Sequence, residues 1–180
     1  MGLDITAYEN IKESDAILKD GEPTDPKTGA YRDDAFICYI NLDFPERAAG
    51  LKDRVCYSFQ GAFKFRAGSY GGCNDWREEL AKLAGYPKAS ATRWGGVIEQ
   101  RHDVGALKVG KGPFFELIWF SDCEGFIGSE VSTKLANDFK EFESKAKDLP
   151  DPHNGWFFAR YQDWKKAFEM ASNNGAVSLH

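Results

Sequence analysis

The chain of 180 residues has no long hydrophobic run, no leader pattern and no paired cysteine motif. No stretch approaches the about 18 consecutive apolar residues that a membrane-spanning helix needs. The N-terminus also lacks the basic-then-apolar pattern of a secretory signal. Without such a signal, four scattered cysteines that form no CxxC pair are expected to be reduced thiols. The sequence therefore predicts a cytoplasmic protein that does not interact with membranes.

Basic residues are fewer than acidic ones: the chain has 23 Lys and Arg and 28 Asp and Glu, which gives a formal net charge of −5. Nucleic acids and anionic membranes attract proteins through a positive field, so general nucleic-acid binding is not expected. The hydrophobic fraction of 42% and the charged fraction of 28% are ordinary for a globular protein. The length fits one domain over residues 1–180 with a single substantial core.

Known metal and nucleotide motifs are missing as well. The glycine-rich segments contain neither a Walker loop nor a dinucleotide fingerprint. His102, His153 and His180 are scattered and show no HxH or HxxxH spacing, so a zinc site is not indicated. The sequence identifies no cofactor, and a divalent metal is compatible with it but not favoured.

Several segments have the character of β-strands. Alternating or continuous apolar residues predict strands over residues 2–8, 36–42, 55–65, 114–120 and 176–180. The run 114–120 is almost wholly apolar, which suits a central strand covered on both sides. Residues 12–34 are charged and rich in turn residues, so they are expected to form a surface loop.

Three helices are expected in the remainder of the chain. The first begins at Asn74 or Asp75 and stops at Gly85. The others cover residues 129–149 and 156–172, with apolar residues spaced three and four apart. Strands early and helices late favour an α+β fold, with a mainly antiparallel or mixed sheet of about five strands packed against about three helices.

A glycine-rich loop is predicted to join a strand to the first helix. Residues 67–74 read Ala-Gly-Ser-Tyr-Gly-Gly-Cys-Asn, and the free backbone N–H groups at a helix start could bind an anion. Nearby Asp75, Glu78 and Glu79 weigh against phosphate, and a tight turn that needs glycine is the alternative. The candidate ligand-binding residues here are Ser69, Tyr70, Gly71, Gly72, Asn74 and Trp76.

A second polar loop, residues 121–125, follows the apolar run and reads Ser-Asp-Cys-Glu-Gly. Asp122 and Glu124 could hold a divalent cation or act as an acid and a base, with Glu116 in register if the strand stays regular. Adjacent carboxylates make Cys123 a poor nucleophile. The alternative is a structural or ligand-orienting role for these acids, in which Ser121, Asp122 and Glu124 contact a ligand.

Aromatic residues make up 14% of the chain. Those beside the polar loops could line a pocket that stacks a planar ligand such as a nucleobase, with arginines at its charged portion. The alternative is that the rings belong to the core. The rings concerned are Tyr70, Trp76, Trp119, Phe126 and Trp156, and the arginines are Arg66, Arg77 and Arg93.

Several blocks of sequence together resemble a family of small uncharacterised phage and prophage proteins. These blocks are residues 1–8, 67–72, 76–77, 80–86, 114–118, 120–125, 167–168 and 174–177, with His180 at the end. The sequence departs from that pattern at Cys73, where an aromatic residue is expected, which argues against an essential thiol. The resemblance implies a viral protein in the cytoplasm of a bacterial host and supplies no chemistry.

Three functions are compatible with these residues. The first is a phage accessory protein that binds a small, nucleotide-like molecule or a host protein between the two loops and could counteract host defence. The second is a metal-dependent hydrolase that uses Asp122 and Glu124. The third is an interaction module without a small-molecule site. Binding is favoured over catalysis, because neither loop contains a known catalytic motif.

Overall fold

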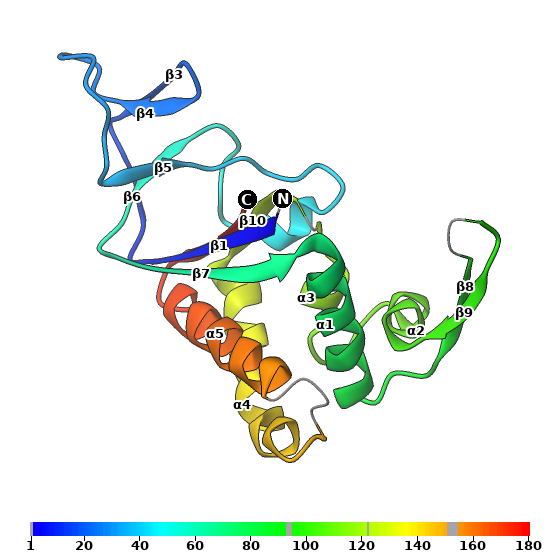
Figure 1. Ribbon diagram of the computed structural model, residues 1–180. Helices are drawn as coiled ribbons and strands as arrows, with labels where there is room; N and C mark the ends of the chain where they lie inside the picture. The colour runs from blue at the N-terminus through cyan, green and yellow to red at the C-terminus, as the bar shows by residue number, and fades with distance from the viewer. Residues whose placement is uncertain (1, 93–94, 122, 151–154) are drawn as a thin grey trace.

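A four-stranded antiparallel sheet forms the centre of the computed structural model, which describes residues 2–92, 95–121, 123–150 and 155–180 (Figure 1). The strand order is β10–β11–β1–β7, so strands from both ends of the chain lie at its middle. Their bounds are Gly125–Gly128 for β10, Ala176–Leu179 for β11, Gly2–Glu9 for β1 and Gly61–Ser69 for β7. The strands predicted at residues 2–8 and 176–180 are thereby confirmed.

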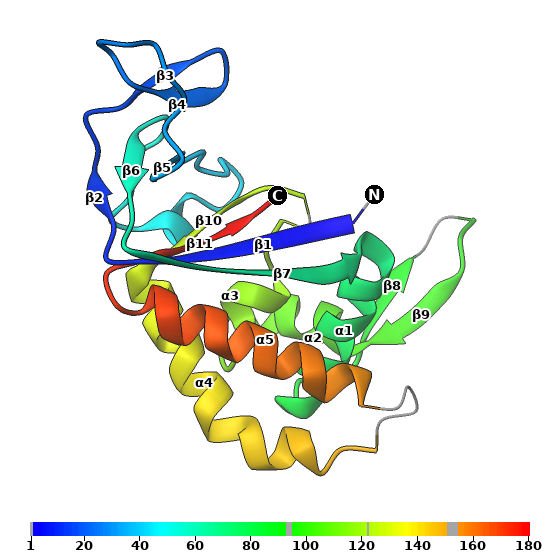
Figure 2. The ribbon, with the colours of Figure 1, turned by 60° about the vertical axis from the view of Figure 1, so that its left-hand side comes forward.

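Two long helices, α4 (Ser129–Lys147) and α5 (Trp156–Ala171), cover one face of this sheet (Figure 2). Both were predicted from apolar residues spaced three and four apart, and those residues are buried or, at Val131 and Phe142, partly buried against the main core. Tyr161 is buried between α4 and α5, where its hydroxyl donates to the carbonyl of Phe139 at 2.6 Å. Alternate residues of β1 complete this main core, which includes Leu3, Ile5, Leu135, Phe139, Tyr161, Trp164 and Phe168.

A second, smaller core lies on the other face of the sheet, at one end. It is covered by a three-stranded sheet in the order β2–β6–β5, formed by Lys12–Glu13, Cys56–Ser58 and Ala35–Ile37. The Phe36 ring stacks on Tyr8 at 4.1 Å and on Phe126 at 5.3 Å.

The remaining elements flank the central sheet. Helix α1 (Tyr70–Leu83) continues directly from β7, and α3 (Phe115–Ile118) packs beside it. A hairpin of β8 (Ala89–Thr92) and β9 (Ile98–Arg101) leads into α2 (His102–Val109). Another hairpin, β3 (Ile17–Lys19) with β4 (Glu22–Thr24), lies far from the helices, and a short 3₁₀ helix, η1, spans Pro45–Ala48 (Figure 1).

Glycine allows α2 to approach the chain that follows α1. A Cβ at Gly105 would collide with the carbonyl oxygen of Pro87. Only a residue without a side chain fits here, so Gly105 determines how closely α2 packs.

The α+β class and the antiparallel pairing are confirmed, but the number of sheets and strands was wrong. The described residues form eleven strands in four small sheets and five α-helices, rather than one sheet of about five strands and three helices. Two expected strands are shorter than predicted, because 36–42 pairs only over Ala35–Ile37 and 55–65 is divided between β6 and β7. Residues 12–34 are mostly exposed, as expected, yet contain the β3–β4 hairpin.

The predicted central strand at 114–120 is wrong, because this run contains the short helix α3. Phe114 has a φ of 58°, and its backbone N–H donates to Oδ2 of Asp138 at 2.7 Å. Phe114 and Leu117 are fully buried among helices, so their apolar character reflects burial rather than strand structure. An apolar run of this length cannot distinguish the two by periodicity.

The predicted start of the first helix at Asn74 or Asp75 is also wrong. Helix α1 begins at Tyr70, because the Ser69 hydroxyl accepts a hydrogen bond from the backbone N–H of Gly72 at 3.1 Å. Serine is a strongly preferred N-cap, and this bond satisfies one of the free N–H groups of the first turn. Gly71, Gly72 and Asn74 are therefore helical residues and not members of a loop. None of the described helices is long and apolar enough to cross a membrane.

Candidate functional site

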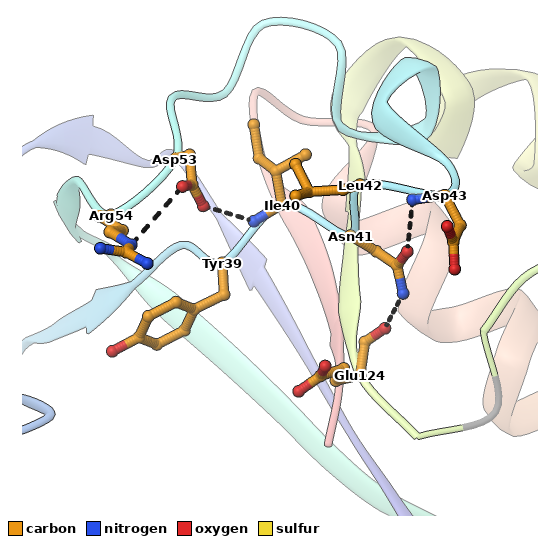
Figure 3. Close-up of a pocket in the computed structure, with 8 residues that line it drawn as sticks. All are labelled: Tyr39, Ile40, Asn41, Leu42, Asp43, Asp53, Arg54 and Glu124. Atoms are coloured by element: carbon orange, nitrogen blue, oxygen red, sulfur yellow. Dashed lines mark hydrogen bonds and ion pairs between the residues drawn. The ribbon is translucent and has the colours of Figure 1, made fainter.

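Two neighbouring hollows lie on either side of Asp43, in the segment between β5 and η1. The first, here named the Trp119 hollow, has a volume of about 340 Å³. The second, named the Tyr39 hollow, has a volume of about 400 Å³ (Figure 3). The Trp119 hollow is lined by Asp43, Phe44, Asn74, Arg77, Asp103, Val104, Ile118, Trp119, Phe120 and Ser121. The Tyr39 hollow is lined by Tyr39, Ile40, Asn41, Leu42, Asp43, Asp53, Arg54 and Glu124.

Two buried arginines hold the backbone that carries Trp119. Arg47, from η1, donates through Nη2 to the carbonyl of Trp119 at 3.4 Å. Arg77, from α1, donates through Nη1 to the carbonyl of Phe120 at 3.2 Å and through Nη2 to that of Ser121 at 3.1 Å. Three successive carbonyls are thus fixed from two elements. We call this arrangement the arginine clamp.

The clamp places an aromatic wall along the Trp119 hollow. The Trp119 ring meets Phe44 edge to face at 6.3 Å, and Phe44 also contacts Phe120 at 5.4 Å. Phe120 is buried, whereas the Trp119 side chain remains 42% exposed. A large ring left open in a hollow can stack on a planar group.

The other wall of this hollow is polar and is set by the start of α2. Glu78 of α1 accepts hydrogen bonds from the backbone N–H groups of His102 at 2.9 Å and Asp103 at 2.8 Å. Arg101 pairs with Asp103 at 2.6 Å and also donates to the carbonyl of Asn74 at 3.4 Å. These contacts fix the Asp103 carboxylate beside the hollow.

Charge in the Trp119 hollow is largely compensated. Burial alone would raise the pKa of Asp103, but the hydrogen bonds and charge of Arg101 outweigh it, and the pKa is lowered. Arg77 is 3% exposed and is bonded to carbonyls and to Oδ1 of Asn74. Asp43 is the remaining charged residue of the lining, and among the described contacts its carboxylate has no cationic partner. The formal charges of Asp43, Asp103, Arg77 and Arg101 sum to zero, but the Asp43 carboxylate is exposed whereas the Arg77 guanidinium is buried.

The Tyr39 hollow is organised by two polar side chains (Figure 3). Asn41 accepts from the backbone N–H of Asp43 at 3.0 Å and donates to the carbonyl of Glu124 at 3.0 Å. Asp53 accepts from the backbone N–H of Ile40 at 2.9 Å and lies 3.8 Å from Arg54. The segment before η1 thus has a defined shape without belonging to a strand.

The residues predicted in the first polar loop have different roles in the structure. Asn74 lines the Trp119 hollow, and with Gly71 it also lines another hollow beside Arg101. Ser69 caps α1, and Gly72 donates to it. Tyr70 packs against the main core, where Trp76 is buried at 1% exposure. We therefore do not retain Trp76 as a ligand-contact residue.

The residues of the second polar loop are also separated. Ser121 lines the Trp119 hollow, whereas Glu124 lines the Tyr39 hollow. Glu116 lies in α3 and pairs with Lys134 at 2.6 Å, so it lines neither hollow. Asp122 lies outside the described residues, so the hydrolase hypothesis that depends on it stays a prediction. Within the described parts of the chain, no three His, Cys, Asp or Glu side chains gather as metal ligands.

One ring and one arginine of the proposed stacking pocket do line a common hollow, namely Trp119 and Arg77. Phe126 belongs to the second core, and Trp156 packs against the main core. Arg66 lines neither hollow, and Arg93 lies outside the described residues.

Sequence reasoning missed most of the segment 39–44, together with Asp103. The segment was read as the end of a strand, although Asn-Leu-Asp at 41–43 interrupts the apolar pattern. That interruption was the available signal. The sequence around Asp103 contains no comparable signal, because the position of Asp103 depends on Glu78, which is distant in the sequence.

The Trp119 hollow therefore presents an exposed indole, polar groups and one carboxylate without a cationic partner among the described contacts, and no histidine or cysteine is among the residues that line it. Such an arrangement can bind a planar ligand. In comparisons with protein-family models, with curated proteins and with solved structures, nothing matches this chain.

Proposed function

We propose that the protein binds a small planar molecule in the Trp119 hollow, and that the ligand is a nucleobase or nucleoside rather than a phosphate-bearing nucleotide. In the phage setting that the sequence resemblance implies, the ligand would be a metabolite of the host cytoplasm. The observation that carries the proposal is the Trp119 ring, which is 42% exposed although the backbone beneath it is held by two buried arginines.

The size and the lining of the hollow support a ligand of this class. A volume of about 340 Å³ is at the small end of ordinary ligand pockets. Trp119 provides a face for stacking, while Asn74 and Ser121 provide polar groups near its edge. Nucleobases combine a flat π-face with hydrogen-bonding edges, which matches these two features.

The charge of the hollow argues against an anionic ligand. Asp43 contributes a carboxylate without a cationic partner in the described structure, and Asp103 contributes one that Arg101 neutralises. Arg77 uses its guanidinium on backbone carbonyls and is not free to bind phosphate. A phosphate would therefore lie near the exposed Asp43 carboxylate, while the only cationic side chain among the lining residues is buried and cannot form a direct ion pair with it.

A thermal-shift and calorimetric series tests the proposal with adenosine, guanosine, cytidine, uridine and their 5′-monophosphates. We expect at least one nucleoside to stabilise the fold, by about 2.7 kcal/mol at a concentration of 100 times Kd. The matching monophosphate should bind more weakly. Stronger binding of the monophosphate would contradict the charge argument.

Replacement of the exposed ring provides the site-specific test. Trp119→Ala should weaken nucleoside binding by about 5- to 150-fold, because stacking of a base on an aromatic side chain contributes about 1–3 kcal/mol. Tyr31→Ala is the control, since Tyr31 is 60% exposed and lies beside the distant β3–β4 hairpin. If no nucleoside binds, or if both variants bind equally well, the proposal fails.

A further inference from the structure

We propose that the Tyr39 hollow is a docking site for an extended basic segment of a partner protein, with an Arg or Lys side chain next to an apolar residue. This proposal concerns another hollow and another class of partner than the proposed nucleoside binding. The two hollows share Asp43, but Trp119 lines only the first and Tyr39 and Glu124 line only the second, so separate variants test the two proposals.

The hollow has an excess of negative charge. Asp43, Asp53 and Glu124 line it together with a single cation, Arg54. Asp53 and Arg54 lie 3.8 Å apart and compensate each other. Among the described contacts, the side-chain carboxylates of Asp43 and Glu124 have neither a hydrogen bond nor an ion pair. Two acceptors are thus available for a cationic group.

These two acidic residues are held in place before any partner arrives. The Asn41 side chain accepts from the backbone N–H of Asp43 and donates to the carbonyl of Glu124, each at 3.0 Å. One amide therefore ties together two segments 83 residues apart in the sequence. Pre-organisation of this kind lowers the conformational entropy lost on binding.

Apolar groups are exposed beside the carboxylates. Leu42 is 84% exposed and Tyr39 is 43% exposed, and both line the hollow. Figure 3 shows the Glu124 side chain pointing toward the side on which the Tyr39 ring lies. A guanidinium can stack on the face of a tyrosine while it pairs with a carboxylate, and Leu42 can bury an apolar neighbour.

The shape favours an extended chain over a single small cation. Tyr39 and Glu124 also line an adjoining hollow of about 270 Å³, which continues to Ser178 and His180 at the end of β11. The Nε2 atom of His180 lies 3.0 Å from the Thr6 hydroxyl, so this side chain has a defined position on the sheet. Two adjoining hollows that share Tyr39 and Glu124 offer room for several residues of a peptide.

An NMR titration with short capped peptides tests the inference. The probe is the pentapeptide Gly-Arg-Leu-Arg-Gly, acetylated and amidated, and the comparison peptide replaces both Arg residues by Glu. We expect the backbone signals of residues 39–43, 53–54 and 124 to shift with the basic peptide only. Binding should weaken strongly when the ionic strength rises from about 0.01 M to about 1 M, because exposed charges are then screened.

Matched variants separate local recognition from general charge. Glu124→Gln should weaken the basic peptide by about five-fold, and Tyr39→Ala should weaken it to a similar extent. Glu141→Gln and Tyr31→Ala make the same changes at exposed positions elsewhere and should leave binding unchanged. Neither Glu124 nor Tyr39 lines the Trp119 hollow, so nucleoside binding should persist in both variants.

Several outcomes would overturn the inference. Absence of shifts at millimolar peptide, equal binding of the acidic peptide, or equal loss in Glu141→Gln would each refute local recognition of a basic segment. Spermidine or free arginine binding as tightly as the pentapeptide would show that the occupant is a small cation and not a protein segment.

Discussion

Replacement of Arg77 by methionine should destabilise the fold and release Trp119 from its position. Methionine replaces the aliphatic part of the arginine side chain and has no donors, so Arg77→Met removes the bonds to the carbonyls of Phe120 and Ser121 and to Oδ1 of Asn74. The guanidinium is 3% exposed, so solvent does not already share these bonds.

The expected magnitude follows from three opposing contributions. A buried acceptor left without a partner costs about 1–3 kcal/mol, which applies fully to the carbonyl of Phe120. The carbonyl of Ser121 is only partly buried, so water that enters the hollow can replace its lost bond. Removal of a buried charge that has no carboxylate partner among the described residues restores part of the stability. We expect a net loss of about 2 kcal/mol, or a Tm lower by about 4–8 °C.

Urea unfolding followed by circular dichroism measures this loss, with Arg54→Met as the control. The Arg54 side chain is 74% exposed, so its replacement should change the free energy of unfolding by less than about 0.5 kcal/mol. A second readout is the Trp119 indole signal in NMR, which should lose its contacts to Phe44 in Arg77→Met only. A loss of less than about 0.5 kcal/mol in Arg77→Met would refute the clamp.

Two further predictions concern α2 and Asp103. Gly105→Ala should destabilise the fold by about 1–3 kcal/mol, because its Cβ would collide with the carbonyl of Pro87. Gly71→Ala, whose Cβ meets nothing within 4 Å, should be neutral or stabilising in the same urea assay, and equal losses would refute the packing argument. The pKa of Asp103 is lower in the folded protein than its ordinary 3.8, so its ionised form stabilises the fold above that pH. This contribution disappears as the pH falls through the folded-state pKa, so Asp103→Asn should lose less stability between neutral and strongly acidic pH than the parent protein does.

The long helices and the two middle strands of the central sheet could be predicted from the sequence, because their apolar residues follow a regular pattern. The stripe from Phe157 to Ala171 gave α5 within a residue at each end. The alternation in Gly2–Glu9 gave β1, since residues on one parity enter the main core. The periodicity of apolar residues is sufficient to predict a helix or strand when one face of that element packs against the rest of the protein.

The site could be predicted only in part, because its geometry depends on contacts distant in the sequence. Ser121 and Asn74 were chosen correctly as neighbours, but Arg77 connects them through a backbone carbonyl that no residue pattern reveals. The apolar run at 114–120 was misassigned because Asp138, far along the chain, caps its first residue. The contribution of Asn41 to the Tyr39 hollow likewise depends on the carbonyl of Glu124.

The arginine clamp has a consequence for how the proposed binding site can change in evolution. At positions 119–121, the described hydrogen bonds from Arg47 and Arg77 all go to main-chain oxygens, and every residue type provides such an oxygen. The backbone there can thus keep its course while the side chains at 119 and 121 are replaced. Substitutions could therefore change the ligand preference of the proposed site without changing the backbone that supports it. A protein under pressure to follow a changing target could exchange the exposed ring at position 119 without rebuilding its core.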